Sequence, residues 1–210
     1  MDTSEHWEHI YRKRRPEQQG WFSPIPQPSL DWITSVVQSR NARVLDAGGG
    51  ASTLVDHLLD AGFRHLTVLD ISQAALEQSQ LRLGSTAANV HWRCSNVLSA
   101  DLAPESVDLW HDRAVFHFLH TDLDRATYKA QVLRTLSPDG VLIAGSFRPG
   151  APPTCSGLPV RHHSAEEIAA FFGPELVLEE QMETTHVTPG DVVQDYIFVR
   201  LRRHGVGKDT

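Results

Sequence analysis

The sequence predicts an α/β fold, in which a doubly wound and mostly parallel sheet of seven strands carries helices on both faces. Short apolar runs alternate with stretches of helical period over residues 42–172, and this alternation is typical of parallel sheets that are covered on both faces. Two longer β-type runs follow, and we expect them to pair antiparallel at the edge of the sheet. A length of 210 residues suits one well-cored domain rather than two.

Two helices and a proline-rich loop are predicted ahead of the sheet. The first helix covers residues 4–15, with Trp7 and Tyr11 on one face, and the second covers 29–39. The loop between them carries Trp21. We expect this aromatic segment to pack over a cleft of the main domain and to shield it as a lid.

The elements of the main domain follow from the spacing of the apolar residues. Strands are expected at 43–46, 66–70, 90–94, 107–110, 141–146, 176–185 and 192–201. Helices are expected at 52–61, 73–83, 126–136 and 165–172, with a turn at 137–140 and a Pro/Gly-rich loop at 149–159. We therefore divide the chain into a helical lid segment (1–40), a main domain (41–203) and a disordered tail (204–210).

Composition and charge limit the classes of function. The formal net charge is −7 and the one basic cluster is short, which disfavours a nucleic-acid partner. No apolar run of about 18 residues and no secretory signal are found, so we expect no membrane partner and a cytoplasmic location. Two cysteines are too few for a disulfide framework, and the twelve histidines show no paired ligand spacing, so we infer no metal.

The strand over 43–46 ends in Asp46, and the turn Gly48-Gly49-Gly50 follows it. Glycines keep such a turn tight and bring backbone N–H groups close to a ligand. In open α/β sheets, ligands bind beyond the carboxyl ends of the strands. Asp46 is placed to hold an ammonium group, and Asp70, at the end of the next strand, to accept hydrogen bonds from both hydroxyls of a ribose.

This turn departs from the dinucleotide-binding pattern Gly-x-Gly-x-x-Gly, because Thr53 occupies the position of the third glycine. The anionic Asp46 would repel a pyrophosphate but would favour a ligand that carries an ammonium group. A turn that merely joins strand to helix would leave the two carboxylates at consecutive strand ends unexplained. The residues therefore indicate a site for S-adenosylmethionine (SAM) and disfavour an NAD-dependent oxidoreductase.

The stretches 44–50 and 69–72 resemble the first motif and the ribose-binding acidic motif of class I SAM-dependent methyltransferases. The resemblance covers residues 42–147 most firmly and implies a Rossmann-like fold. Where the family usually has an acid facing the adenine amino group, this chain has Asn96, whose amide oxygen can still accept, and the Val97 N–H could meet a ring nitrogen.

The N-terminal segment is also similar to that of small bacterial members of the family, which fold aromatic residues over the cofactor. Together, these resemblances and motifs assign SAM binding to Asp46, Gly48, Gly49, Gly50, Asp70, Ile71, Asn96, Val97, Trp7, Tyr11 and Trp21.

Methyl transfer from a sulfonium is an in-line displacement that needs neither a metal nor a covalent intermediate, and much of its acceleration comes from holding the nucleophile in line and excluding water. The acceptor site should follow the fourth strand, where Asp112, Arg113 and His117 are the candidate catalytic residues. His117 could take a proton from a thiol or hydroxyl, and Arg113 could orient an anionic group. A structural pairing of Asp112 with Arg113 stays open, and His111 is excluded because it would point to the opposite side of the strand.

We predict methyl transfer to a small-molecule nucleophile and lean toward a thiol or another sulfur acceptor. One alternative is a protein lysine N-methyltransferase, which needs an acidic or aromatic channel that Asp122 and Asp124 could border. A non-catalytic SAM-binding regulator is the second alternative. The loop around Cys155 could fold over the acceptor, and the sequence leaves the oligomeric state open.

Overall fold

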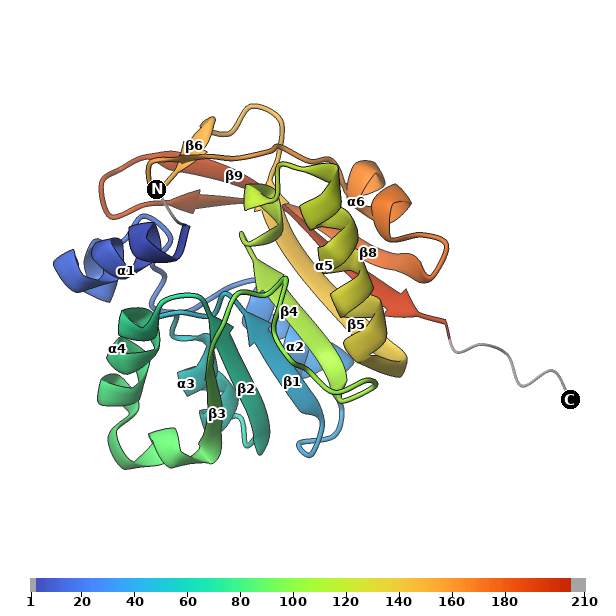
Figure 1. Cartoon of the computed structure of the whole chain (residues 1–210), viewed down its shortest axis with the longest axis horizontal. Helices are drawn as coiled ribbons and strands as arrows, with labels where there is room; N and C mark the ends of the chain where they lie inside the picture. The colour runs from blue at the N-terminus through green and yellow to red at the C-terminus, as the bar shows by residue number, and fades with distance from the viewer. Residues whose placement is uncertain (1–2, 205–210) are drawn as a thin grey trace, which may run out of the picture.

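A seven-stranded sheet runs through the computed structural model, which describes residues 3–204 (Figure 1). The strands of this sheet are β1 (Arg43–Ala47), β2 (His65–Asp70), β3 (Val90–Cys94), β4 (Val107–Arg113), β5 (Leu136–Phe147), β8 (Leu176–Val187) and β9 (Val193–Arg203). A separate hairpin consists of β6 (Thr154–Cys155) and β7 (Leu158–Pro159).

The strand order of the sheet is β3-β2-β1-β4-β5-β9-β8. Neighbouring strands among β1 to β5 pair in parallel, whereas β9 pairs antiparallel with β5 and β8 antiparallel with β9. The predicted doubly wound sheet with an antiparallel edge pair is confirmed.

Helices cover both faces of this sheet. They are α1 (Thr3–Lys13), α2 (Ser29–Val36), α3 (Leu54–Asp60), α4 (Gln73–Leu83), α5 (Asp122–Thr135) and α6 (Ala165–Phe172), with the short 3₁₀ helices η1 (Pro16–Gln18), η2 (Gly84–Asn89) and η3 (Phe116–Phe118). In Figure 1, α5 lies in front of the sheet, and α2 and α3 lie behind it.

Each face of the sheet buries its own cluster, because successive side chains along a strand point to opposite faces. In β1, Val44 packs in the cluster that contains residues of α2, α3 and α4, and Leu45 packs in the cluster that contains residues of α5 and α6. Burial on both faces explains why apolar residues occupy consecutive positions in the central strands, such as Val44 and Leu45 in β1.

Several elements differ from the sequence predictions in their extent or type. β4 continues to Arg113, and α5 begins at Asp122 because the Thr121 side chain caps it by accepting the Asp124 N–H. The turn predicted at 137–140 is part of β5, where Asp139 takes a φ of +63°. The expected loop at 149–159 contains the hairpin β6–β7.

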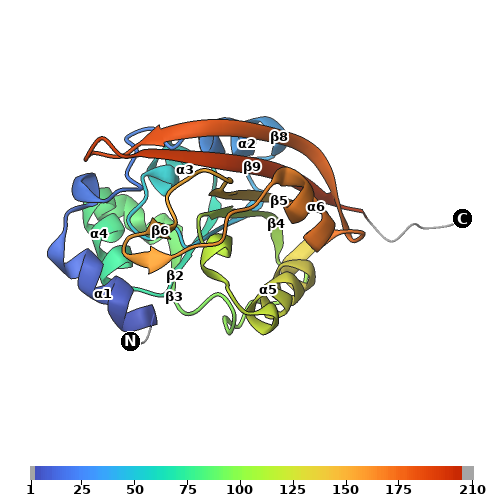
Figure 2. The same ribbon diagram turned by 90° about the horizontal axis from the view of Figure 1, so that it is seen from above.

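The predicted lid segment divides into two parts. In Figure 2, α1 lies next to β6, whereas Trp32 and Ile33 of α2 are buried in the core beneath the sheet. Of the predicted tail, 205–210 lie outside the described residues. Over 3–204, no helix has the length and apolar character that crossing a membrane requires.

Candidate functional site

The strand order reverses between β1 and β4, and a cavity of about 340 Å³ lies at the carboxyl ends of these strands. This is the position at which open α/β sheets bind their ligands. The volume is near the lower end of the range of about 300–1,000 Å³ that is usual for small-molecule sites. The cavity is therefore the candidate functional site.

The glycine turn after β1 fits closely against its surroundings. Gly48 and Gly50 take φ values of +71° and +47°, in the left-handed region that favours glycine. A Cβ on Gly48 would lie 2.0 Å from Cγ2 of Val115, and one on Gly49 would lie 2.5 Å from Oδ2 of Asp46. Only glycine leaves the turn this compact and its backbone open to a ligand.

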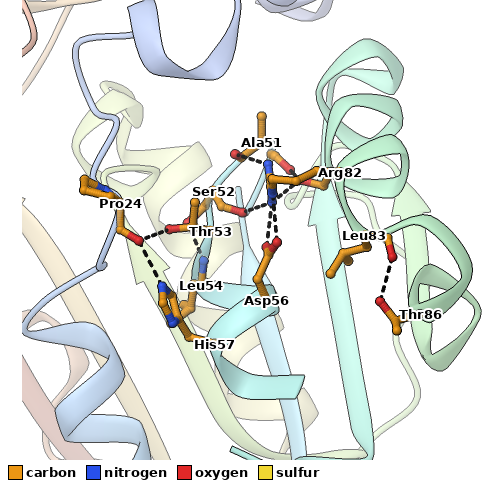
Figure 3. Close-up of polar contacts among 12 residues, drawn as sticks. Pro24, Ala51, Ser52, Thr53, Leu54, Asp56, His57, Arg82, Leu83 and Thr86 are labelled. Atoms are coloured by element: carbon orange, nitrogen blue, oxygen red, sulfur yellow. Dashed lines mark hydrogen bonds and ion pairs between the residues drawn. The ribbon is translucent and has the colours of Figure 1, made fainter. Parts of the chain in front are cut away.

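Arg82 of α4 holds the far side of this turn (Figure 3). Its guanidinium donates to the carbonyl oxygens of Ala51 (3.0 Å) and Ser52 (2.6 Å), and it pairs with Asp56 at 2.7 Å. No sequence pattern predicts this contact, which fixes the backbone between the glycines and α3.

Thr53, which replaces the third glycine of a dinucleotide motif, connects the turn to the N-terminal segment. Its hydroxyl donates to the Ser23 carbonyl at 2.9 Å, and Nε2 of His57, one turn further along α3, contacts the Pro24 carbonyl at 2.9 Å (Figure 3). A glycine at position 53 would lose this connection.

Asp70 lies at the end of β2 and is 7% exposed. It accepts hydrogen bonds from backbone N–H groups, including that of Ser72 at 2.8 Å. Burial, and to a smaller extent the charge of Asp46, raise the pKa of Asp70 to about 7 in spite of these bonds. A buried carboxylate of this kind suits neutral hydroxyl donors, such as those of a ribose.

Asn96 follows β3 and forms a local turn, in which its Oδ1 accepts the Leu98 N–H at 2.9 Å. The predicted contact of this oxygen with an adenine amino group would use its second lone pair. Val97 and Ile71 line the cavity beside it.

The helix α1 contributes Trp7 and Tyr11 to the cavity wall, and Trp21 follows in the loop. The ring centroid of Tyr11 lies 6.1 Å from that of Trp7 and 6.0 Å from that of Trp21. Glu8 fastens α1 to the start of α4, since it accepts hydrogen bonds from the Ser72 hydroxyl (2.7 Å) and from a backbone N–H of α4. The aromatic segment thus forms part of the cavity wall.

Five histidines contact the backbone of the segments that cover the cavity. Since a carbonyl oxygen only accepts, each Nε2 donates its proton in these bonds. The pairs are His6 with Ser156 (3.0 Å), His57 with Pro24 (2.9 Å), His120 with Pro159 (3.0 Å), His162 with Pro152 (3.0 Å) and His186 with Gly20 (2.8 Å). Five of the histidines thus anchor the two loops that contain residues 20–24 and 152–159.

A buried hydrogen-bonded chain reaches from β1 to α2. Oδ1 of Asp46 lies 2.7 Å from Nδ1 of His111, and Nε2 of His111 lies 2.8 Å from the Ser29 hydroxyl. All three residues line the cavity. The exclusion of His111 was wrong, because the register of β4 places it opposite Asp46 on the same face of the sheet.

Asp112 and His117 do not line the cavity. Asp112 points to the opposite face of the sheet, where it accepts hydrogen bonds from the Tyr128 hydroxyl and from the N–H groups of Val115 (2.8 Å) and Phe116 (3.1 Å), and burial raises its pKa to about 6. His117 is fully buried, and burial lowers its pKa to about 3, which keeps the ring neutral. The catalytic roles predicted for the two residues, including proton transfer by His117, therefore have no support in their positions.

Arg113 is the one candidate of the three that reaches the cavity. Rather than pairing with Asp112, it donates to the Trp21 carbonyl at 3.2 Å, and its guanidinium carbon lies 5.3 Å from the ring centroid of Tyr196. Cys155 lines the same region, where burial raises the pKa of its thiol to about 11.

The cavity wall has two halves on either side of the glycine turn. On the side of β2 and β3, the wall includes Thr3, Trp7, Asp70, Ile71, Ser95, Asn96, Val97 and Leu98. On the side of β4 and β9, it includes Trp21, Pro26, Ser29, His111, Arg113, Cys155 and Tyr196, and this side is named the acceptor half for the role that we propose for it below.

Most of the predicted site residues come together at this cavity. Those that line it are Trp7, Tyr11, Trp21, Asp46, Gly48, Gly49, Asp70, Ile71, Asn96, Val97 and Arg113. Gly50 is not part of the wall, and its N–H donates to Asp70 instead. Within residues 3–204, no group of three or more His, Cys, Asp or Glu side chains is arranged to hold a metal ion.

Known proteins resemble this chain in sequence and in fold. Residues 44–140 match the family described as "Methyltransferase domain". The EEF1A lysine methyltransferase 2 of Danio rerio is 20% identical over 206 residues, which are 91% of this chain and 82% of the relative.

Among solved structures, one concerned with the conversion of a disulfide bond into a thioacetal group during echinomycin biosynthesis matches with a TM-score of 0.79 at 20% identity, over 98% of this chain and 94% of the other. The 1,6-didemethyltoxoflavin-N1-methyltransferase of Burkholderia thailandensis, with S-adenosylhomocysteine bound, matches with a TM-score of 0.68 at 21% identity, over 85% and 77%.

Proposed function

We propose an acceptor for this chain from the premise that it is a class I SAM-dependent methyltransferase, since it carries a methyltransferase domain on the fold of that class. The acceptor that we propose is a small-molecule nucleophile, with a thiol or another sulfur group as the first candidate. One observation carries the proposal: the covered cavity of about 340 Å³ has to hold both the cofactor and the acceptor. That space suits a small acceptor better than the surface of a macromolecule.

We assign the cofactor to the half of the cavity beside β2 and β3. Asp70 would accept the ribose hydroxyls, and the segment around Asn96 and Val97 would contact the adenine. The Gly48–Gly49 backbone and the free oxygen of Asp46 would face the amino acid part. The buried carboxylate and the closely packed turn support this placement.

Bound SAM supplies an electrophilic methyl group, and the chain itself has to hold the acceptor, exclude water and remove a proton. The rings of Trp7, Tyr11 and Trp21 exclude water. The Ser29 hydroxyl presents the end of the chain that leads to His111 and Asp46. A thiol would give its proton to this hydrogen-bonded network of Ser29, His111 and Asp46 while its sulfur attacks the methyl carbon.

The hydrogen-bonded network of Ser29, His111 and Asp46 can accept the proton of a thiol, and the relatives do not decide the acceptor atom. The structure from echinomycin biosynthesis concerns a disulfide, which is sulfur chemistry of a related kind, but at 20% identity it establishes only the fold.

A protein lysine methyltransferase is the second candidate, and the Danio rerio relative favours it. Asp124 lines the cavity near Phe118, as a channel for a lysine would require, whereas Asp122 does not.

Purified protein with labelled SAM and a panel of small thiols, phenols and amines tests the proposal. We expect methylated thiols and S-adenosylhomocysteine. Products from amines or phenols alone would reject the sulfur acceptor, and a labelled protein band in a cell lysate would favour the lysine candidate. SAM binding without any turnover would favour the regulator.

The hydrogen-bonded chain has its own test. A His111→Gln variant should still bind S-adenosylhomocysteine but should lose most turnover with a thiol. His91→Gln, at an exposed position on β3, is the matched control. Full turnover by His111→Gln would contradict the proton-accepting role.

A further inference from the structure

Three buried polar atoms on the acceptor half have no hydrogen-bond partner among the described residues. They are Nε1 of Trp21, Nε of Arg113 and the hydroxyl oxygen of Tyr196, which Arg113 approaches without forming a bond of normal geometry. All three residues line the same cavity, and the Tyr196 side chain is buried. Buried polar atoms are nearly always paired in folded proteins, so three unpaired atoms on one wall indicate a missing ligand.

Arg113 is also a cation without a carboxylate partner. Other arginines of the chain form ion pairs, among them Arg43 with Asp108 and Arg82 with Asp56. The Arg113 side chain donates to a backbone carbonyl and lies over the ring of Tyr196, and within residues 3–204 it forms no ion pair with a carboxylate. Asp46 lines the same cavity, and its Oδ1 is paired with His111.

The charge of the cofactor makes this cation significant. SAM carries a sulfonium and an ammonium group. Asp46 faces the ammonium group in the proposed placement, and a guanidinium on the wall of the same small cavity still repels both cations unless a further anion lies beside it. A guanidinium presents its N–H groups in a planar fork that matches a carboxylate. The indole N–H and the phenol hydroxyl add two further donors on the same wall.

We infer that Arg113, Trp21 and Tyr196 form a binding subsite for a carboxylate. The inference rests on the proposed function, and it narrows the class of acceptors to those with an anionic group beside the nucleophile if the acceptor supplies the carboxylate. The amino acid part of SAM has a carboxylate as well. The shared chemistry is therefore the carboxylate, and experiments have to separate its two sources.

The first arm measures the cofactor. S-adenosylhomocysteine carries the carboxylate, whereas 5′-methylthioadenosine lacks the whole amino acid part. If the carboxylate of the cofactor occupies the subsite, Arg113→Gln should lower the affinity for S-adenosylhomocysteine at least about tenfold in calorimetric titrations and should leave the affinity for methylthioadenosine unchanged. Arg64→Gln, which replaces an exposed arginine between α3 and β2, is the matched control.

The second arm measures the acceptor with mercaptoacetate and its neutral amide, which have nearly the same shape. Both are titrated into protein saturated with S-adenosylhomocysteine, so that the result does not depend on turnover. If the carboxylate of the acceptor occupies the subsite, wild type should prefer mercaptoacetate at least about tenfold and Arg113→Gln should lose this preference.

Tyr196→Phe and Trp21→Phe each remove one donor and keep the ring, and they should give smaller losses in the same arm. These two variants also serve if Arg113→Gln does not fold. If none of the three substitutions changed the binding measured in either arm, the inference would be overturned. Because both arms measure binding, failure of thiol methylation in the turnover assay would reject the proposed acceptor without deciding this result.

Discussion

Replacing Asp70 by asparagine should stabilise the free protein at about pH 8 and at the same time weaken its affinity for SAM. Burial, followed by the charge of Asp46, raises the pKa of Asp70 to about 7. In the unfolded chain, an aspartate ionises near its ordinary pKa of about 3.9. Asparagine keeps the shape of the side chain and removes the buried charge.

The sign and size of the effect follow from proton linkage. A carboxyl group with a higher pKa in the folded state binds its proton more tightly there, so ionisation opposes folding. This destabilisation is fully present above about pH 7, shrinks as the pH falls from about 7 to about 4, and is absent below that. A difference of about 3 pKa units corresponds to about 4 kcal/mol at about pH 8 and less than about 2 kcal/mol at about pH 5.

Urea unfolding followed by tryptophan fluorescence measures this difference. The Asp70→Asn variant should unfold at a higher urea concentration than wild type at about pH 8, and the gap should narrow at about pH 5. Asp60→Asn, at an exposed position in α3, controls for the loss of a surface charge. An equal gap at both pH values, or a variant that is less stable at about pH 8, would refute the reasoning.

The same ionisation should appear in binding. Ribose hydroxyls donate to the carboxylate, and only about one-tenth of Asp70 is ionised at about pH 6. Wild type should therefore bind S-adenosylhomocysteine roughly tenfold more weakly at about pH 6 than at about pH 8, whereas Asp70→Asn should bind it weakly at both. Equal affinity of variant and wild type at about pH 8 would remove Asp70 from the cofactor site.

Three further predictions concern the cavity and its support. Gly48→Ala should weaken cofactor binding at least about tenfold, since its Cβ would lie 2.0 Å from a valine side chain at a φ of +71°. Gly62→Ala is the control in the same titrations, because Gly62 has a φ of +87° and nothing within 4 Å of its Cβ position, so that this variant measures the backbone strain alone. Tyr128→Phe removes the hydroxyl that donates to Asp112, and it should lower the free energy of unfolding by about 2 kcal/mol without changing cofactor affinity. Burial raises the pKa of Cys155 to about 11, so its thiol should react slowly with iodoacetamide at about pH 8 by mass spectrometry, and fast labelling of the folded protein would contradict this.

The sheet and the glycine turn could be predicted from the sequence because their signals are local. The apolar runs that become β1 and β2 end in Asp46 and Asp70, and parallel strands bring their carboxyl ends to one edge of the sheet. Which residues of β4 line the cavity depends on the face of the sheet that each side chain takes. His111 faces Asp46 because of its register with β1, and no pattern within β4 records that register.

The acceptor half lay further beyond the reach of the sequence. It combines Ser29 at the start of α2, Cys155 in the hairpin β6–β7 and Tyr196 in β9. These residues meet only because β9 pairs beside β5 and because the N-terminal segment and the hairpin β6–β7 both reach the cavity. Contacts between such distant segments are set by tertiary packing, so the acceptor residues appear only in the folded chain.

The five histidine contacts of the cover have a consequence for how this enzyme can diversify. Each contact ends on a backbone carbonyl, such as that of Pro24 or Ser156, rather than on a side chain. Every residue type offers the same carbonyl, so substitutions in the covering loops leave the anchoring bonds in place. Side chains on these loops can therefore change through mutation while the loops keep their position beside the cavity.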